Sequence, residues 1–199
     1  NTRLYFNFLQ KTHLLPVPTI WGTPGAINST SSPNSGPTLS ELCHSPVVPN
    51  SGQATTVTVS ANDPEGINAL TLRYSVNGGS FQSNAMTSNS DGTYSGTIPG
   101  QSGSAIVRFY VEASDSASAS SLFPAAGPDG GAFYKVQDNY ADKTGLRHNF
   151  RIIMSNRDRS SLFLNTNRMS NDRFPVTVIE DETKVYYDVG LRLKASGFG

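Results

Sequence analysis

The chain has 199 residues, of which 36% are hydrophobic and 10% aromatic, so it can form a sizeable core in one large or two small domains. Charged residues make up 15% of the chain, and 15 basic residues balance 15 acidic ones to a net charge of +0. This balance argues against electrostatic capture of nucleic acid, and no apolar run is long enough for membrane insertion.

The polar composition and the cysteine count indicate where the protein acts. Ser, Thr, Asn and Gly take the place of many charged residues, which favours a secreted or cell-surface protein. Cys43 is the single cysteine, so neither a disulfide within the chain nor a cysteine metal cluster is available. Because the sequence starts at Asn1 and its last predicted strand has no closing element after it, we expect an excerpt from a longer protein.

Residues 1–37 are predicted to form an N-terminal strand, an extended arm and a polar linker. The segment Arg3–Leu9 alternates apolar side chains on both faces, which suits a strand covered on two sides. We therefore expect it to add to the sheet of a second copy and to make the protein a homo-oligomer or polymer. The candidate assembly residues are Leu4, Tyr5, Phe6, Phe8 and Leu9.

Residues 38–137 are predicted to form a seven-stranded immunoglobulin-like β-sandwich. In the clearest strand, Ser104–Ala113, the residues Val107, Phe109 and Val111 alternate with polar neighbours such as Arg108, so one face of the strand lies in a core. The other predicted strands are Thr38–His44, Ala54–Ala61, Ala69–Val76, Ser80–Met86, one that begins at Asp91, and Ala132–Gln137. The residues between Ala113 and Ala132 are expected to form a loop. Seven strands in about 100 residues are typical of immunoglobulin-like or fibronectin-III-like domains.

Residues 138–199 are predicted to form a small, incomplete α+β unit. A strand is expected within His148–Met154, and a capping box at Ser155–Asp158 opens a short helix that runs to Leu164. Arg173–Glu180 and Lys184–Lys194 then form a hairpin. The fold class predicted for the whole chain is therefore mainly β.

Three carboxylates are the candidate metal ligands. Asp63, Glu65 and Asp115 belong to loops that a sandwich places at one end, where oxygen ligands can hold a calcium ion. The alternative is that they are ordinary turn residues, since three carboxylates are fewer than the usual calcium ligand set. No other cofactor is expected. His13, His44 and His148 lack ligand spacing and are expected to be structural or solvent-facing.

Several segments resemble known families. Five of them are similar to the immunoglobulin-like module of large secreted bacterial proteins: His44–Pro49, Asp63–Gly66, Leu72–Ser75, Asp91–Pro99 and Val107–Ala113. Three others resemble the opening of the CotH (spore coat protein H) kinase-like domain: Phe150–Met154, Met169–Arg173 and Val185–Lys194. Tyr5–Phe6 and Thr23–Asn28 resemble the tail of a lamin-tail-like module.

The resemblance implies a multidomain surface protein. The nucleotide- and metal-binding residues of the CotH family lie beyond the matched segments, so no catalytic residue is assigned in this chain. The function expected is a non-catalytic extracellular structural or adhesive module that assembles into a filament by strand addition. The alternative is the N-terminal part of a secreted CotH-like protein kinase.

Overall fold

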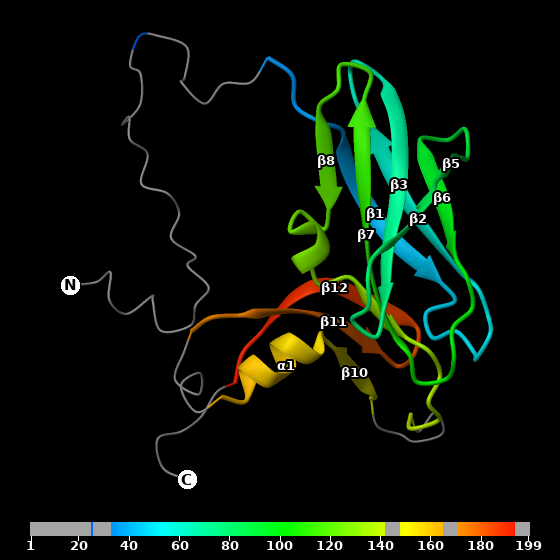
Figure 1. Cartoon of the computed structure of the whole chain (residues 1–199), viewed down its shortest axis with the longest axis vertical. Coiled ribbons are helices and arrows are strands. Elements are labelled where there is room, and N and C mark those ends of the chain that lie inside the picture. The colour runs from blue at the N-terminus through cyan, green and yellow to red at the C-terminus, as the bar shows by residue number, and fades with distance from the viewer. Residues whose placement is uncertain (1–24, 26–32, 142–147, 165–170, 194–199) are drawn as a thin grey trace.

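The computed structural model describes residue 25 and residues 33–141, 148–164 and 171–193 (Figure 1). The predicted strand Arg3–Leu9, with its five candidate assembly residues, and His13 lie outside the described residues. Within the described part, no helix is long and apolar enough to cross a membrane.

Two antiparallel sheets form a sandwich. One sheet has the order β1-β2-β6-β5, with β1 at Thr38–Ser45, β2 at Thr55–Asn62, β6 at Thr93–Ile98 and β5 at Thr87–Ser88. The other has the order β4-β3-β7-β8, with β4 at Gln82–Ala85, β3 at Ile67–Val76, β7 at Ile106–Asp115 and β8 at Ser120–Phe123, and β9 at Phe133–Lys135 also pairs with β7. In the lettering used for immunoglobulin domains, β1 to β7 are strands A, B, C, C′, D, E and F, and β8 and β9 together are strand G. The two sheets are then A-B-E-D and C′-C-F-G. This distribution is that of an immunoglobulin-like sandwich, so the predicted fold class is confirmed.

The core lies between these two sheets, as the alternation in the sequence predicts. Val107, Phe109 and Val111 of β7 are at most 1% exposed, while their neighbours along the strand are only half-buried. Val57 and Val59 of β2 face them from the other sheet and are fully buried. Burial of side chains of this size contributes roughly 1.5–3 kcal/mol each, which is enough to set the register of each strand.

The turn at Asn77–Gly78 is also as predicted. Asn77 and Gly78 have φ values of 50° and 79°, and the amide of Gly79 donates to the carbonyl of Val76 at 2.9 Å. Asparagine and glycine tolerate positive φ, so this pair favours a tight turn. The side-chain oxygen of Asn77 accepts from the amide of Ile106 at 2.9 Å and ties the turn to β7.

The expectation of a plain loop between Ala113 and Ala132 is wrong. The structure contains β8 there, and a short 3-10 helix, η2, at Gly127–Asp129. Both β8 and β9 pair along the same edge of β7, so η2 interrupts a single edge strand. The sequence Ser-Ser-Leu-Phe of β8 is too short for a hydrophobic period to be recognised.

The α+β unit is built on a third antiparallel sheet. Its order is β10-β11-β12, with β10 at Phe150–Ile153, β11 at Phe174–Glu180 and β12 at Lys184–Leu191. Helix α1 spans Asn156–Leu162, and the side chain of Ser155 caps it by accepting from the amide of Asp158, as the capping box predicts. The β11–β12 turn contains Asp181 and Glu182 at positive φ.

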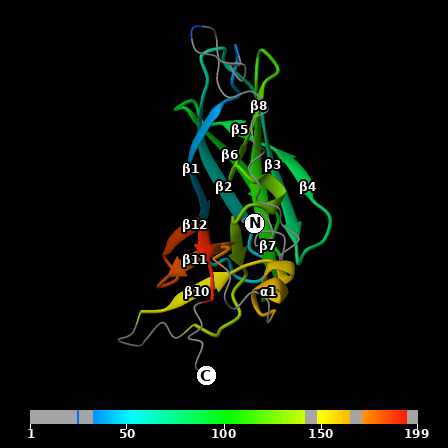
Figure 2. The same cartoon turned by 90° about the vertical axis from the view of Figure 1, so that its left-hand side faces the viewer.

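This third sheet covers part of the outer face of the sandwich. Ile153 and Ile179 are buried against Phe133 of β9, together with Val47 and Val48 of the loop that follows β1. Figures 1 and 2 both show β10, β11 and β12 at one end of the sandwich, with α1 beside them. The two units therefore share a second, smaller core.

Candidate functional site

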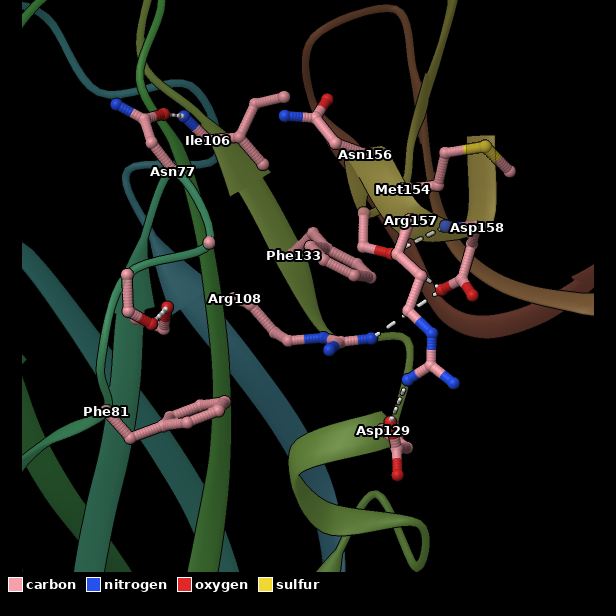
Figure 3. Close-up of a pocket in the computed structure, with 14 residues that line it drawn as sticks. Asn77, Phe81, Ile106, Arg108, Asp129, Phe133, Met154, Asn156, Arg157 and Asp158 are labelled. Carbon is pink, nitrogen blue, oxygen red and sulfur yellow. Dashed lines mark hydrogen bonds and ion pairs between the residues drawn. The ribbon is translucent and has the colours of Figure 1, made fainter. Parts of the chain in front are cut away.

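The candidate site is a pocket where the sandwich meets α1. It encloses about 370 Å³ and opens between the β3–β4 turn, β7, β9, η2 and the start of α1 (Figure 3). Because side chains alternate along β7, Arg108 points away from the sandwich core and into this pocket. Phe133 is its cross-strand partner on β9 and lies beside it.

Arg108 is held in place by three contacts. Its Nε donates to the carbonyl of Gly130 at 3.2 Å, and its guanidinium carbon lies 4.9 Å from the centre of the Phe133 ring. Its Nη2 lies 3.8 Å from Oδ2 of Asp158, too far for a hydrogen bond. Burial lowers the pKa of Arg108, although the nearby carboxylates of Asp158 and Asp129 oppose this shift.

Helix α1 supplies the opposite wall. The hydroxyl of Ser155 accepts from the amide of Asp158 at 3.0 Å and donates to its Oδ2 at 2.8 Å, which fixes a carboxylate whose side chain is only 5% exposed. Arg157, one residue earlier, extends outward and lies 3.8 Å from the carboxylate of Asp129 on η2. Figure 3 shows these four charged side chains close together, with Arg108 beside Asp158 and Arg157 beside Asp129.

The remaining walls combine amide and apolar side chains. Asn77 and Asn156 stand on opposite sides, while Phe81, Ile106 and Met154 provide apolar surface. Among the described lining residues, no serine lies beside a histidine base, which nucleophilic catalysis by serine would need. The donors and acceptors of these side chains converge on a preformed hollow, an arrangement that can hold a small ligand.

The three predicted metal ligands do come together. Ligand oxygens of Asp63, Glu65 and Asp115 all lie within 4.8 Å of one another, at the end of the sandwich where β2 turns into β3 and β7 into β8. Asp63 also accepts from the amide of Glu65 at 2.9 Å, and Asp115 accepts from the amide of Ala119 at 2.8 Å. The juxtaposition fits both the calcium hypothesis and ordinary turn capping, so calcium binding stays a prediction.

His148 has carboxylate neighbours that the sequence did not indicate. Its Nδ1 lies 2.8 Å from Oδ2 of Asp181 and 3.7 Å from Oε1 of Glu180, and these three residues could offer ligands within 4.8 Å. Glu180 also lies 3.6 Å from Nζ of Lys184. The hydrogen bonds from the backbone amide of Asn149 and from His148 lower the pKa of Asp181. The group is a set of surface ion pairs on the β11–β12 turn.

The junction between the two units could not be found from sequence. Gly131 lies between β9 and the third sheet: its carbonyl accepts from the hydroxyl of Thr177 at 2.5 Å and from the amide of Asp188 at 3.2 Å, and its own amide donates to Oδ1 of Asp188 at 3.0 Å. A Cβ at this position would lie 2.9 Å from the backbone nitrogen of Val176, so glycine is required for the close approach. The sequence of this glycine-rich loop does not indicate which glycine makes the close approach to β11.

A charge network closes the far side of the junction. Arg151 of β10 donates to Asp138 at 2.8 Å and also to Glu182 of the β11–β12 turn, while Lys135 contacts Asp138 at 2.6 Å. Burial alone would raise the pKa of Asp138, but the hydrogen bonds from Lys135 and Arg151 outweigh it and hold that pKa well below its ordinary value. Lys135 and Asp138 are three residues apart, but Arg151 lies 13 residues beyond Asp138 and 31 before Glu182, so only the fold completes the network.

Comparison with known proteins adds little to this description. No protein-family model and no curated protein matches the chain. Among solved structures, a similar one is "Crystal structure of Br derivative BhCBM56", with 10% sequence identity and a TM-score of 0.31 over 44% of this chain and 82% of that chain. A likeness of this size carries no argument about function.

Proposed function

We propose that this chain is a non-catalytic structural or adhesive module of a secreted or cell-surface protein. The observation that carries the proposal is the junction at Gly131, where backbone and side-chain hydrogen bonds from β11 and β12 fasten the third sheet to the sandwich. A joint of this kind holds two units in one orientation, which is what a spacer or a presenting scaffold needs.

Cooperativity of unfolding tests the structural role. If the sandwich and the α+β unit act as one block, calorimetry should give one transition whose calorimetric and van't Hoff enthalpies agree. Hydrogen exchange should then give similar protection in β7 and in β11. Separate melting of the third sheet at a temperature where β7 stays protected would contradict a rigid spacer.

Assembly through the N-terminal segment is the finer part of the proposal. The third sheet supports it, because its edge strand β10 pairs only with β11 among the described residues. Phe150 and Ile152 of β10 and Tyr186 of β12 are 57%, 54% and 48% exposed, and the register places Val178 between Ile152 and Tyr186. A soluble monomer rarely leaves such a row uncovered. Strand addition by Arg3–Leu9 of a second copy would extend this sheet, and a head-to-tail contact that does not close generates a filament.

Deletion of residues 1–10 tests assembly. We expect the full chain to form large species in light scattering and electron microscopy, and the deleted chain to stay folded but monomeric at the same concentration. A full-length variant with Leu4, Phe6 and Phe8 changed to serine is the matched control, because it keeps the length of the arm and loses only the apolar side chains. It should also stay monomeric. Equal assembly of all three proteins, or a monomeric full chain at high concentration, would rule out strand addition by this segment.

The same exposed face favours one second candidate, the N-terminal part of a CotH-like kinase. In that case further elements of a larger domain would cover Phe150, Ile152 and Tyr186. The two candidates differ in chemistry, since a structural module needs no nucleotide. We expect the purified chain to show no magnesium-dependent ATP turnover. Measurable turnover would favour the kinase candidate and contradict the non-catalytic one.

A further inference from the structure

The pocket at Arg108 has the size and the lining of a small-ligand site. Its volume of about 370 Å³ lies at the lower end of the range for small-ligand sites, which is about 300–1,000 Å³. Its walls come from strands β7 and β9, a tight turn and a capped helix, so the hollow is formed without a ligand. The question is which ligand its side chains would recognise.

Arg108 brings hydrogen-bond donors that no residue in the described part of the chain accepts. Its side chain is 18% exposed, and in the described part of the chain only its Nε makes a hydrogen bond, to Gly130. The terminal nitrogens lie beyond hydrogen-bonding distance of Asp158, at 3.8 Å for the nearer pair of atoms. Hydrogen bonds from a charged donor are stronger than those from a neutral one, so these terminal nitrogens would bind oxygen atoms of a ligand in the pocket favourably.

The charges around the pocket favour a neutral ligand. Arg108 lies 3.8 Å from Asp158 and Arg157 lies 3.8 Å from Asp129, so each cation already has a carboxylate beside it and the four charges cancel. A ligand with a net negative charge would meet two carboxylates as well as two guanidinium groups. A ligand that brings directed hydrogen bonds without charge gains from both kinds of group.

The apolar wall indicates the rest of the ligand. Phe81, Ile106 and Met154 line the pocket together with the amides of Asn77 and Asn156. Such a lining matches a ring that carries C–H groups on its faces and hydroxyl groups at its edge, since each hydroxyl both donates and accepts. We propose that this pocket binds a neutral saccharide ring, with Arg108 donating to its hydroxyl oxygens and Asp158 or Asp129 accepting from its hydroxyl groups.

Titration calorimetry and ligand-observed NMR with defined sugars test the proposal. The probes are glucose, galactose, mannose, N-acetylglucosamine and their common disaccharides, with galacturonate as an anionic probe and alanine as a zwitterionic one. For a small ligand we expect a dissociation constant on the order of 1 mM for at least one neutral sugar. Galacturonate and alanine should bind more weakly than that sugar.

Three variants locate the binding. Arg108→Met should weaken it by about tenfold or more, because hydrogen bonds from a charged donor are lost. Asn156→Trp should block the mouth of the pocket without removing any hydrogen bond that the structure shows. Arg73→Met is the control, because Arg73 lies on the same outer face but pairs with Glu112 at 3.0 Å outside the pocket. It should leave the affinity unchanged.

Several results would overturn the saccharide proposal. The first is that no neutral sugar binds, and the second is that galacturonate or alanine binds more strongly than the sugars. The third is that Asn156→Trp, folded with the melting temperature of the unchanged protein, still binds the sugar. If Arg108→Met does not fold, Asn156→Trp still decides, since Asn156 is exposed. None of these results bears on the structural role, which the calorimetric transition of the sugar-free protein tests separately.

Discussion

His44 of β1 and Tyr187 of β12 form a partly buried hydrogen bond that links the sandwich to the third sheet. Nε2 of His44 lies 2.9 Å from the carbonyl oxygen of Val47, which can only accept. In the neutral imidazole Nε2 therefore carries the proton, and Nδ1 accepts from the hydroxyl of Tyr187. The imidazole also stacks on Tyr134, with 5.2 Å between ring centres. Burial lowers the pKa of His44, so a neutral histidine is part of the junction at neutral pH.

This bond predicts that acid destabilises the protein. Burial lowers the pKa of His44 from 6.5 to about 4, and its bond to the carbonyl of Val47 offsets this only in part. The unfolded chain then binds a proton more readily than the folded one, so stability is complete above pH 6.5 and falls as the pH drops from about 6.5 to 4. This difference in pKa between the folded and the unfolded chain corresponds to roughly 3 kcal/mol in the free energy of unfolding. Urea titrations at pH 7.5, 6.0, 5.0 and 4.5 would measure the loss.

Two variants distinguish the effect of protonating His44 from the effect of losing its hydrogen bond to Tyr187. His44→Gln removes the titrating group and should flatten the stability between pH 6.5 and 4. Tyr187→Phe keeps the ring but leaves Nδ1 without its donor, so it should lower stability by about 1–3 kcal/mol while the pH dependence persists. Asp138 contributes in more acidic solution, because its pKa is held low. An unchanged pH dependence in His44→Gln would show that another group is responsible.

Truncation of Phe109 should unfold the sandwich. Phe109 is 1% exposed at the centre of β7, so Phe109→Ala removes a large buried ring and should cost about 3–5 kcal/mol in a denaturant titration. Glu112→Ala is the matched control on the opposite face of the same strand, where Glu112 pairs with Arg73 and is 41% exposed. Its cost should stay below about 1 kcal/mol. Equal losses of stability in the two variants would contradict the placement of Phe109 in the core and of Glu112 on the outer face.

Thr177→Val should loosen the junction and leave the sandwich folded. The hydroxyl of Thr177 donates to the carbonyl of Gly131 at 2.5 Å and accepts from the amide of Phe133 at 2.8 Å. Valine leaves the amide of Phe133 without a partner, while the carbonyl of Gly131 keeps its bond from the amide of Asp188. We expect a loss of about 1–3 kcal/mol. Hydrogen exchange should rise in β11 more than in β7.

The control for this change is Thr58→Val in β2. The hydroxyl of Thr58 has only a long contact of 3.4 Å to Ser95, and threonine and valine have the same shape in a strand. Its stability should therefore change little. A Thr177→Val protein as stable as Thr58→Val would show that the hydrogen bonds at Gly131 do not hold the units together.

Glu65→Gln tests the carboxylate group at the end of the sandwich. Without a cation, three carboxylates within 4.8 Å repel one another, so removing one charge should raise the melting temperature by about 1–2 °C. If calcium binds, millimolar calcium should raise the melting temperature of the unchanged protein and not of Glu65→Gln. An identical response of both proteins to calcium would contradict the calcium hypothesis.

The strands, the turn and the helix start that the sequence predicts correctly all depend on local sequence patterns. Strand β7 has a strict two-residue period, the Asn77–Gly78 turn has residues that tolerate positive φ, and Ser155 stands three residues before the acidic side chain of a capping box. Each feature depends on residues that are close in sequence. Periodicity also placed Asp63, Glu65 and Asp115 at the same end of the sandwich, because it located the strands on either side of them.

The sequence by itself determined that the chain is mainly β, which side chains of β7 face the core and where α1 begins, because a two-residue period and a helix cap follow from local backbone geometry. Only the tertiary structure decided that the third sheet covers Phe133, that Arg108 and Asp158 face one pocket, and that His44 bonds to Tyr187. Arg108 and Asp158 are 50 positions apart, and His44 and Tyr187 are 143 positions apart. Their geometry depends on how the two units pack, and no pattern within a single strand or helix records it.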